Sequence, residues 1–208
     1  GPLALHASDA SAYLQAVAGG AFDPAAPVPA RPTVAWSATL GFAETHPEVA
    51  AVAAAALQRL TDRIEVTDTP VQLRDPHQAW QYLRSHSPST RDTEAAERVR
   101  GGNNVRLQRL FRVVDLLAMP TTPNSPHGHD GPGATLSVAL TWAFNLSGHP
   151  AISIPAGYTT AGAPVGLQLV ARPGSEQLLL SLASHALAPA PTQSGGDGLI
   201  PQVGPNPR

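Results

Sequence analysis

Cysteine and lysine are both absent from this sequence, and its single methionine is Met119. Without cysteine the chain can form no disulfide, no thiolate zinc site and no cysteine nucleophile. It also has no apolar run near the ~20 residues that a membrane-spanning helix requires, and no charged segment ahead of an apolar one as in a secretory signal. We therefore expect a soluble, cytoplasmic protein with no membrane partner.

Charged residues are scarce, and the formal net charge is only −2. So small a charge gives no general attraction to nucleic acid or to an anionic membrane. Five of the thirteen basic residues, all of which are arginine, nevertheless gather around Gly101: Arg98, Arg100, Arg106, Arg109 and Arg112. This cluster could contact phosphate, but no aromatic residues are interleaved with it. We interpret it as a solvated helix face and predict no nucleic-acid partner.

The length of 208 residues suffices for one large domain or most of one. We assign residues 1–187 to that domain. Residues 188–208 hold nine prolines and glycines in 21 positions and few apolar anchors, which predicts a disordered tail. Because residue 1 is not methionine, the opening Gly-Pro-Leu-Ala is either a scar left by a tag-cleaving protease or an internal segment of a longer protein.

Helical and strand-like patterns alternate along residues 1–187. The first half predicts a helix over 8–18, a strand over 32–36, a helix from Thr45 to Arg63, a strand over 64–67 and a helix from Asp75 to Leu83. Thr45 and Glu48 have the spacing of a capping box at the start of the second helix.

The second half predicts a helix over 94–111, a buried strand over 113–119, a buried helix over 134–146, strands over 152–155 and 165–170, and a final helix over 177–187. Gly101 and Gly102 should interrupt the first of these helices, since glycine costs ~1 kcal/mol at an interior helical position. The glycine-rich connection over 157–163 predicts an antiparallel hairpin. Together these elements indicate an α/β fold with a mixed β-sheet core flanked by helices.

Two threonines follow the buried strand that Pro120 should terminate, because proline cannot donate to a ladder. Thr121 and Thr122 then lie at the carboxyl end of a strand, which is where open α/β sheets place their ligands. They are candidates for substrate binding. The alternative is a turn in which the threonine hydroxyls bond to local backbone.

A second set of candidates follows the predicted buried helix. Gly148 suits a left-handed helix cap, and His149 precedes a proline, which favours an extended backbone. Asn145 could hold this loop through side-chain hydrogen bonds. We weigh a buried structural asparagine against direct substrate contact and leave both open.

Other chemistries lack support in the sequence. His127 and His129 could chelate a metal, but a site needs three or four fixed ligands, so no metal is predicted. No Gly-x-Ser-x-Gly elbow is present. Ser153 falls inside a strand and Ser194 in the predicted tail, and neither has an adjacent base that could activate it.

Several segments in order resemble the amidase-signature family of hydrolases. They are GPLA, RPTVAWS, DLLAMPTTP, NLSGHPAISIPAG and PVGLQLVARPGSEQLLLSLA. The resemblance covers about residues 1–187 and identifies them as the C-terminal portion of an amidase domain, with the N-terminal catalytic half missing. On this reading the opening GPLA is family sequence, and the chain is truncated.

The resemblance implies hydrolysis of a carboxamide C–N bond by a serine nucleophile, a second serine in a cis peptide and a lysine. All three lie upstream in the family, and this chain has neither the lysine nor the Gly-Gly-Ser-Ser run that carries the nucleophile. The chain alone is thus expected to hold no catalytic residue and to be inactive. The resemblance implies no cofactor.

By the same resemblance, the chain supplies a pocket wall that contains Thr121, Thr122, Asn145, Gly148 and His149. The implied partners are a small-molecule amide and the N-terminal amidase half, and a homodimer is left open. An unpaired sheet edge and apolar faces on the helices over 8–18 and 134–146 should favour association. The rival interpretation is a non-catalytic interaction or regulatory subunit, or the product of a degraded gene.

Overall fold

A computed structural model describes residues 1–28, 31–85, 89–131 and 137–187. The elements follow one another in this order: α1 (Ala7–Ala18), β1 (Thr33–Trp36), α2 (Pro47–Gln58), β2 (Glu65–Thr67), α3 (His77–Arg84), α4 (Thr90–Leu110), β3 (Leu116–Pro120), α5 (Trp142–Ser147), β4 (Ala151–Tyr158), β5 (Pro164–Ala171) and α6 (Glu176–Leu187). The predicted tail lies outside the described residues. No helix in the described ranges is both long and apolar enough to cross a membrane.

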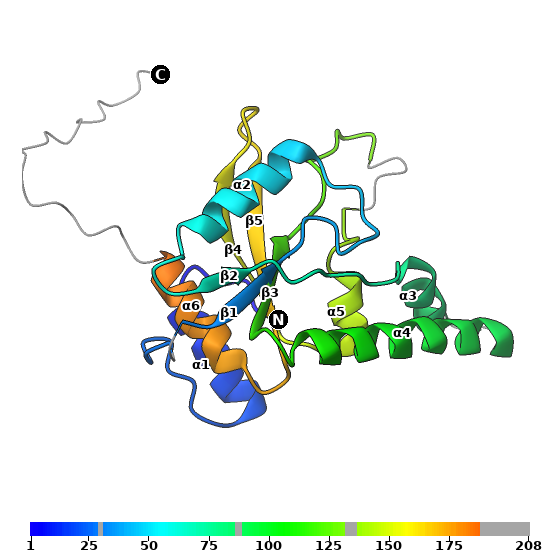
Figure 1. The fold of residues 1–208 in the computed structure, drawn as a ribbon, viewed down its shortest axis with the longest axis horizontal. Coiled ribbons are helices and arrows are strands. Elements are labelled where there is room, and N and C mark those ends of the chain that lie inside the picture. Colours follow the sequence, from blue (N-terminus) through cyan, green and yellow to red (C-terminus); the bar gives the residue numbers. More distant parts are fainter. Residues whose placement is uncertain (29–30, 86–88, 132–136, 188–208) are drawn as a thin grey trace, which may run out of the picture.

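The five strands form one mixed sheet in the order β2-β1-β3-β5-β4, as Figure 1 shows. β1 pairs in parallel with both β2 and β3, whereas β5 runs antiparallel to β3 and to β4. The predicted α/β class, the mixed sheet and the late hairpin are therefore confirmed.

Helices cover both faces of the sheet, because side chains along a strand point alternately to opposite faces. On one face, Leu167 and Leu169 of β5 join a core with side chains of α2 and α6. On the other face, Val170 and Met119 join a second core with side chains of α4 and α5. The result is a layered arrangement in which β3, buried at all five positions, is the central strand.

The capping box predicted at Thr45 is wrong. The helix begins at Pro47 with His46 as its N-cap, and it ends at Gln58 rather than Arg63. The Thr45 hydroxyl instead donates to the Ala38 carbonyl at 2.6 Å. The Glu48 carboxylate accepts from the backbone amide of Thr160, 112 positions away. Partners that are distant in sequence thus take both side chains.

Helix α4 is continuous through its glycines, so the predicted interruption is also wrong. Asn103 explains the continuity, because its side chain accepts from the Arg74 amide at 2.9 Å and donates to the Arg74 carbonyl at 2.8 Å. Leu107 and Leu110 then bury the following turn in the core. This tertiary packing offsets the intrinsic cost of glycine in the helix.

Helix α5 is much shorter than the predicted helix over 134–146. Residues 137–141 form turns, in which the Thr141 hydroxyl bonds to the Val138 carbonyl at 2.9 Å. Trp142, Ala143 and Phe144 are buried, whereas Val138 is exposed. The expectation of an exposed apolar face therefore fails for α5 itself.

Helix α1 lies loosely against α6 at the edge of the molecule. Of its twelve residues only Ala7 and Ser11 are buried. Tyr13 and Val17 are exposed, and so is Leu5, which precedes the helix. The predicted exposure of apolar side chains on this helix is therefore confirmed.

Candidate functional site

Two hydroxyl groups meet at the carboxyl end of β3. The backbone amide of Thr121 donates to the Gly166 carbonyl at 2.9 Å, which fixes the threonine beside β5. The Thr121 Oγ1 and Ser153 Oγ atoms then lie 2.5 Å apart. Each has no other hydrogen-bond partner among the described residues. Two mutually bonded hydroxyls that reach solvent can donate to and accept from a ligand.

Gly166 makes this hydroxyl pair possible. A Cβ atom at this position would lie 2.6 Å from the Thr121 hydroxyl and 2.7 Å from the Ser153 hydroxyl. Both distances are far below van der Waals contact. Only glycine therefore leaves room for the two hydroxyls to meet above β5.

Strand register brings Ser153 to this place. Ser153 pairs with Gln168, and Gln168 also pairs with Met119, so the three residues share one face of the sheet. Gln168 is buried and donates to the Leu140 carbonyl at 3.2 Å. Ser153 is exposed, because it lies on the edge strand beyond the cover of α5. The sequence analysis assigned it to a strand core; the alternation of exposed and buried positions along β4 was the signal it missed.

The loop after Thr121 is tied to the start of α2. The His46 amide donates to the Pro123 carbonyl at 2.7 Å, so the helix N-terminus lies beside the carboxyl end of β3. Asn124 donates to the Ser137 hydroxyl at 3.1 Å, while its Oδ1 atom is buried without a partner among the described residues. Thr122 is half-buried between these contacts.

The other predicted site residues lie at the opposite end of the strands. The Ala171 amide donates to the Pro150 carbonyl, whereas Thr121 bonds to Gly166. Five residues of β5 separate these two bonds, which corresponds to about 17 Å at roughly 3.4 Å per residue. Register thus divides the predicted pocket wall into Thr121 and Thr122 at one end, and Asn145, Gly148 and His149 at the other.

At this opposite end the residues act as a helix cap. Gly148 has φ 72° and ψ 17°, so the predicted left-handed cap is confirmed. His149 stacks on Phe111 with ring centroids 5.3 Å apart, and its Nδ1 lies 2.8 Å from the Ser147 hydroxyl. Burial lowers the pKa of His149. Asn145 is exposed and its side chain bonds to no described residue, so the expected buried, hydrogen-bonded asparagine is wrong.

The contact between Ser147 and His149 does not make a nucleophile–base pair. A catalytic histidine needs a third group to orient it, and no described residue bonds to Nε2 of this imidazole. The two residues are two positions apart in one tight cap. We therefore assign the contact to the structure of the loop.

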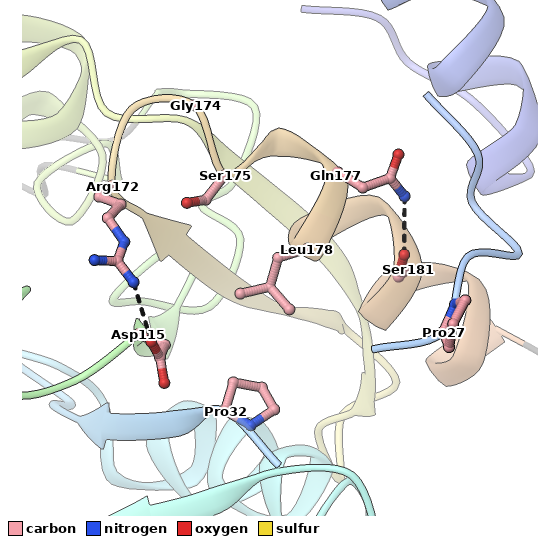
Figure 2. A pocket seen from close by; sticks show the side chains of 9 residues that line it. All are labelled: Pro27, Pro32, Asp115, Arg172, Gly174, Ser175, Gln177, Leu178 and Ser181. Atoms are coloured by element: carbon pink, nitrogen blue, oxygen red, sulfur yellow. Dashed lines mark hydrogen bonds and ion pairs between the residues drawn. The ribbon is translucent and has the colours of Figure 1, made fainter. Parts of the chain in front are cut away.

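A pocket of about 410 Å³ opens at the amino end of β3, where α6 begins. Figure 2 shows Arg172 reaching the Asp115 carboxylate, which it meets at 3.2 Å. The same carboxylate accepts from the Thr33 amide at 2.9 Å and from the Thr33 hydroxyl at 3.1 Å. Its charge is thus used to join β1 to β3, and it is not free for chemistry.

His127 and His129 are both exposed in the loop that follows β3. The Nδ1 atom of His127 lies 2.8 Å from the neighbouring Gly128 carbonyl. Nowhere in the described ranges do three histidine or acidic side chains come close enough to hold a metal ion.

These observations define the class of protein: an α/β protein with a mixed sheet and an open polar site at the carboxyl end of its central strand. The sequence model of the family described as Amidase matches residues 42–180, about two thirds of the chain. The chain therefore belongs to the amidase family, which is also called the amidase-signature family.

Curated relatives are similar over part of the chain. The putative amidase AmiA2 of Mycobacterium bovis is 36% identical over 107 residues, which are 47% of this chain and 21% of that protein. One subunit of the glutamyl-tRNA(Gln) amidotransferase from Synechococcus is 40% identical over 95 residues, which are 43% of this chain and 20% of that protein. The match thus spans about a fifth of these relatives.

Solved structures share the fold over most of the chain. A bacterial aryl acylamidase of the amidase-signature family matches with a TM-score of 0.66 and 18% identity, over 82% of this chain and 47% of that one. A 6-aminohexanoate cyclic dimer hydrolase matches with a TM-score of 0.65 and 21% identity, over 88% of this chain and 53% of that one. The chain thus accounts for about half of each of these structures.

Proposed function

We propose that residues 1–187 form the C-terminal portion of an amidase domain, and that the complete domain hydrolyses the C–N bond of a small carboxamide. The observation that carries the proposal is the match to about half of the aryl acylamidase chain, together with the family match over residues 42–180. The remaining half of such a domain would supply the catalytic residues that the amidase resemblance implies.

In the proposed reaction a serine oxygen from that other half attacks the amide carbonyl. The C–N bond breaks, the amine leaves with the serine's proton relayed through the lysine, and water then releases the acid from the acyl-enzyme. Backbone amides near the nucleophile stabilise the oxyanion. None of these groups belongs to the present chain, which has no lysine.

The role of this chain is to form a wall of the substrate pocket. Thr121, Ser153 and Thr122 support this role, because the first two present hydroxyls at an exposed sheet surface that a polar substrate group can reach. Substrate contact by Asn145, Gly148 and His149 stays a prediction. A separation of about 17 Å along β5 means that one compact amide cannot touch both groups.

The second candidate is a non-catalytic interaction subunit. Its support is the loosely packed α1, which leaves Tyr13 and Val17 exposed beside Leu3 and Leu5. The same exposed side chains also suit contact with the other half of an amidase domain. A cytoplasmic location and a homodimer remain predictions.

Active-site labelling distinguishes the two candidates. The complete open reading frame and the 208-residue chain are each incubated with a serine-directed fluorophosphonate and with a panel of aryl amides. The proposal expects stoichiometric labelling and amide turnover in the complete protein, and only background in the chain alone. Background in both would support the interaction subunit, and labelling of the chain alone would point to a serine nucleophile within it.

A further inference from the structure

A shallow groove of about 300 Å³ lies between the extended segment after β2 and the last turns of α4. Figure 1 shows this segment, residues 68–76, running alongside α4 on its way to α3. Val71 of the segment and Leu110 of the helix contribute apolar side chains to the groove. Val113, just beyond the helix, adds an aliphatic side chain that is 65% exposed.

The charge of the groove has one sign. Its nine lining residues include Arg106 and Arg109 and no acidic residue. Neither arginine forms an ion pair with a described carboxylate, although Arg106 donates to the Gly102 carbonyl at 3.2 Å. Farther up the same helix, Arg98 and Arg100 do pair, with Glu94 and Glu97. The unpaired charge of α4 is therefore concentrated at the groove, in a protein whose formal net charge is −2.

The floor of the groove also has free backbone groups. The peptide groups of Val71 and Gln72 form no hydrogen bond with another described residue, while the next amide, that of Leu73, donates to the Leu40 carbonyl at 2.8 Å. An extended segment with unpaired peptide groups can accept another strand by β-augmentation, in which alternate side chains of the added strand determine the fit. Segment, apolar floor and arginines thus lie within one groove.

We propose that this groove binds an extended acidic peptide segment of a partner protein. The peptide backbone pairs with Val71 and Gln72, its aliphatic side chains cover Val113 and Leu110, and its carboxylates meet Arg106 and Arg109. This binding is independent of amide hydrolysis, since the groove contains neither member of the hydroxyl pair at the carboxyl end of β3.

Fluorescence anisotropy with a labelled heptapeptide of alternating glutamate and valine tests the proposal on the 208-residue chain. We expect saturable binding that weakens at about 0.5 M salt, where charges on the surface are screened. The double substitution Arg106→Gln with Arg109→Gln should weaken binding roughly tenfold, because two partly exposed ion pairs together contribute about that factor. The matched control Arg98→Gln with Arg100→Gln should leave the affinity unchanged.

Two competitors test the chemistry of the occupant. An all-glutamate heptapeptide should bind several-fold more weakly than the alternating one, since it lacks the aliphatic contacts, and Val113→Asp should remove that difference. Equal binding of both peptides, or stronger binding of a single-stranded oligonucleotide, would overturn the proposal in favour of a general anion surface. Absence of binding, or equal loss in the two double variants while circular dichroism shows a native fold, would also overturn it.

Discussion

The two ends of β3 use polar side chains in opposite ways. At the amino end, one carboxylate satisfies the amide and the hydroxyl of Thr33 and pairs with Arg172, so Asp115 has its partners inside the protein. At the carboxyl end, the hydroxyls of Thr121 and Ser153 bond only to each other and reach solvent. Polar groups that are satisfied internally stabilise a fold, whereas groups left open to solvent are available to a ligand. A polar side chain at a strand end therefore indicates a binding site only when its internal partners are known.

The largest effect on stability is expected at the amino end. Asp115→Ala leaves the partly buried amide of Thr33 without its acceptor, which should lower the free energy of unfolding by about 2 kcal/mol. Asp115→Asn keeps one oxygen acceptor and should cost less. Urea titrations of the three proteins measure this. If Asp115→Ala unfolds like the wild type, the carboxylate does not join β1 to β3.

A smaller loss is expected when the hydroxyl pair is forced apart. Gly166→Ala places a methyl group 3.1 Å from the Thr121 Cβ and closer still to both hydroxyl oxygens. Overpacking of this kind costs about 1–3 kcal/mol. Gly101→Ala, where an added Cβ meets nothing within 4 Å, should instead stabilise the helix by up to about 1 kcal/mol. Equal thermal shifts for the two glycines would show that Gly166 has no special role.

The helix cap at the amino end should respond to pH through His149. Burial lowers its pKa, so the unfolded chain binds a proton more readily than the folded one, and stability falls as the pH drops below about 6.5. His149→Phe keeps a ring against Phe111 but cannot titrate. Thermal melting at pH 7.5 and pH 5.5 should therefore show a smaller acid-induced loss in the variant. An identical loss in both proteins would assign the pH dependence to other groups.

The smallest effect is expected at Asn145. This side chain is exposed and bonds to no described residue, so Asn145→Ala should change the free energy of unfolding by less than about 0.5 kcal/mol. Chemical denaturation is sufficient to measure this. A loss of 1 kcal/mol or more would show that the asparagine has a partner in a longer chain.

Features that depend on local pattern were predictable from the sequence. The apolar run before Pro120 indicated a buried strand, and the strand there is buried at every position. Gly148 was placed in the left-handed cap that it adopts. In both cases the signal lies within a few residues, where composition and backbone sterics decide the outcome.

Features that depend on distant partners were not predictable. Thr45 and Glu48 match a capping box in spacing, yet Ala38 and Thr160 take their side chains. The grouping of Thr121 with His149 failed because strand register, which no local pattern reveals, places them at opposite ends of β5. Ser153 was missed for the same reason, since its neighbour Thr121 is 32 positions away.

The central claim is that the carboxyl end of β3 is the substrate side of an amidase domain, and a matched pair of serine variants in the complete protein tests it most directly. The measurement is kcat/KM across a panel of small amides for Ser153→Ala and for Ser175→Ala, the latter at the pocket of the amino end. We expect Ser153→Ala to change kcat/KM or the substrate preference by roughly tenfold, about the value of one hydrogen bond, with an unchanged Tm. Ser175→Ala should leave the profile unchanged. Wild-type kinetics in Ser153→Ala across the whole panel, or an equal change in both variants, would contradict the account.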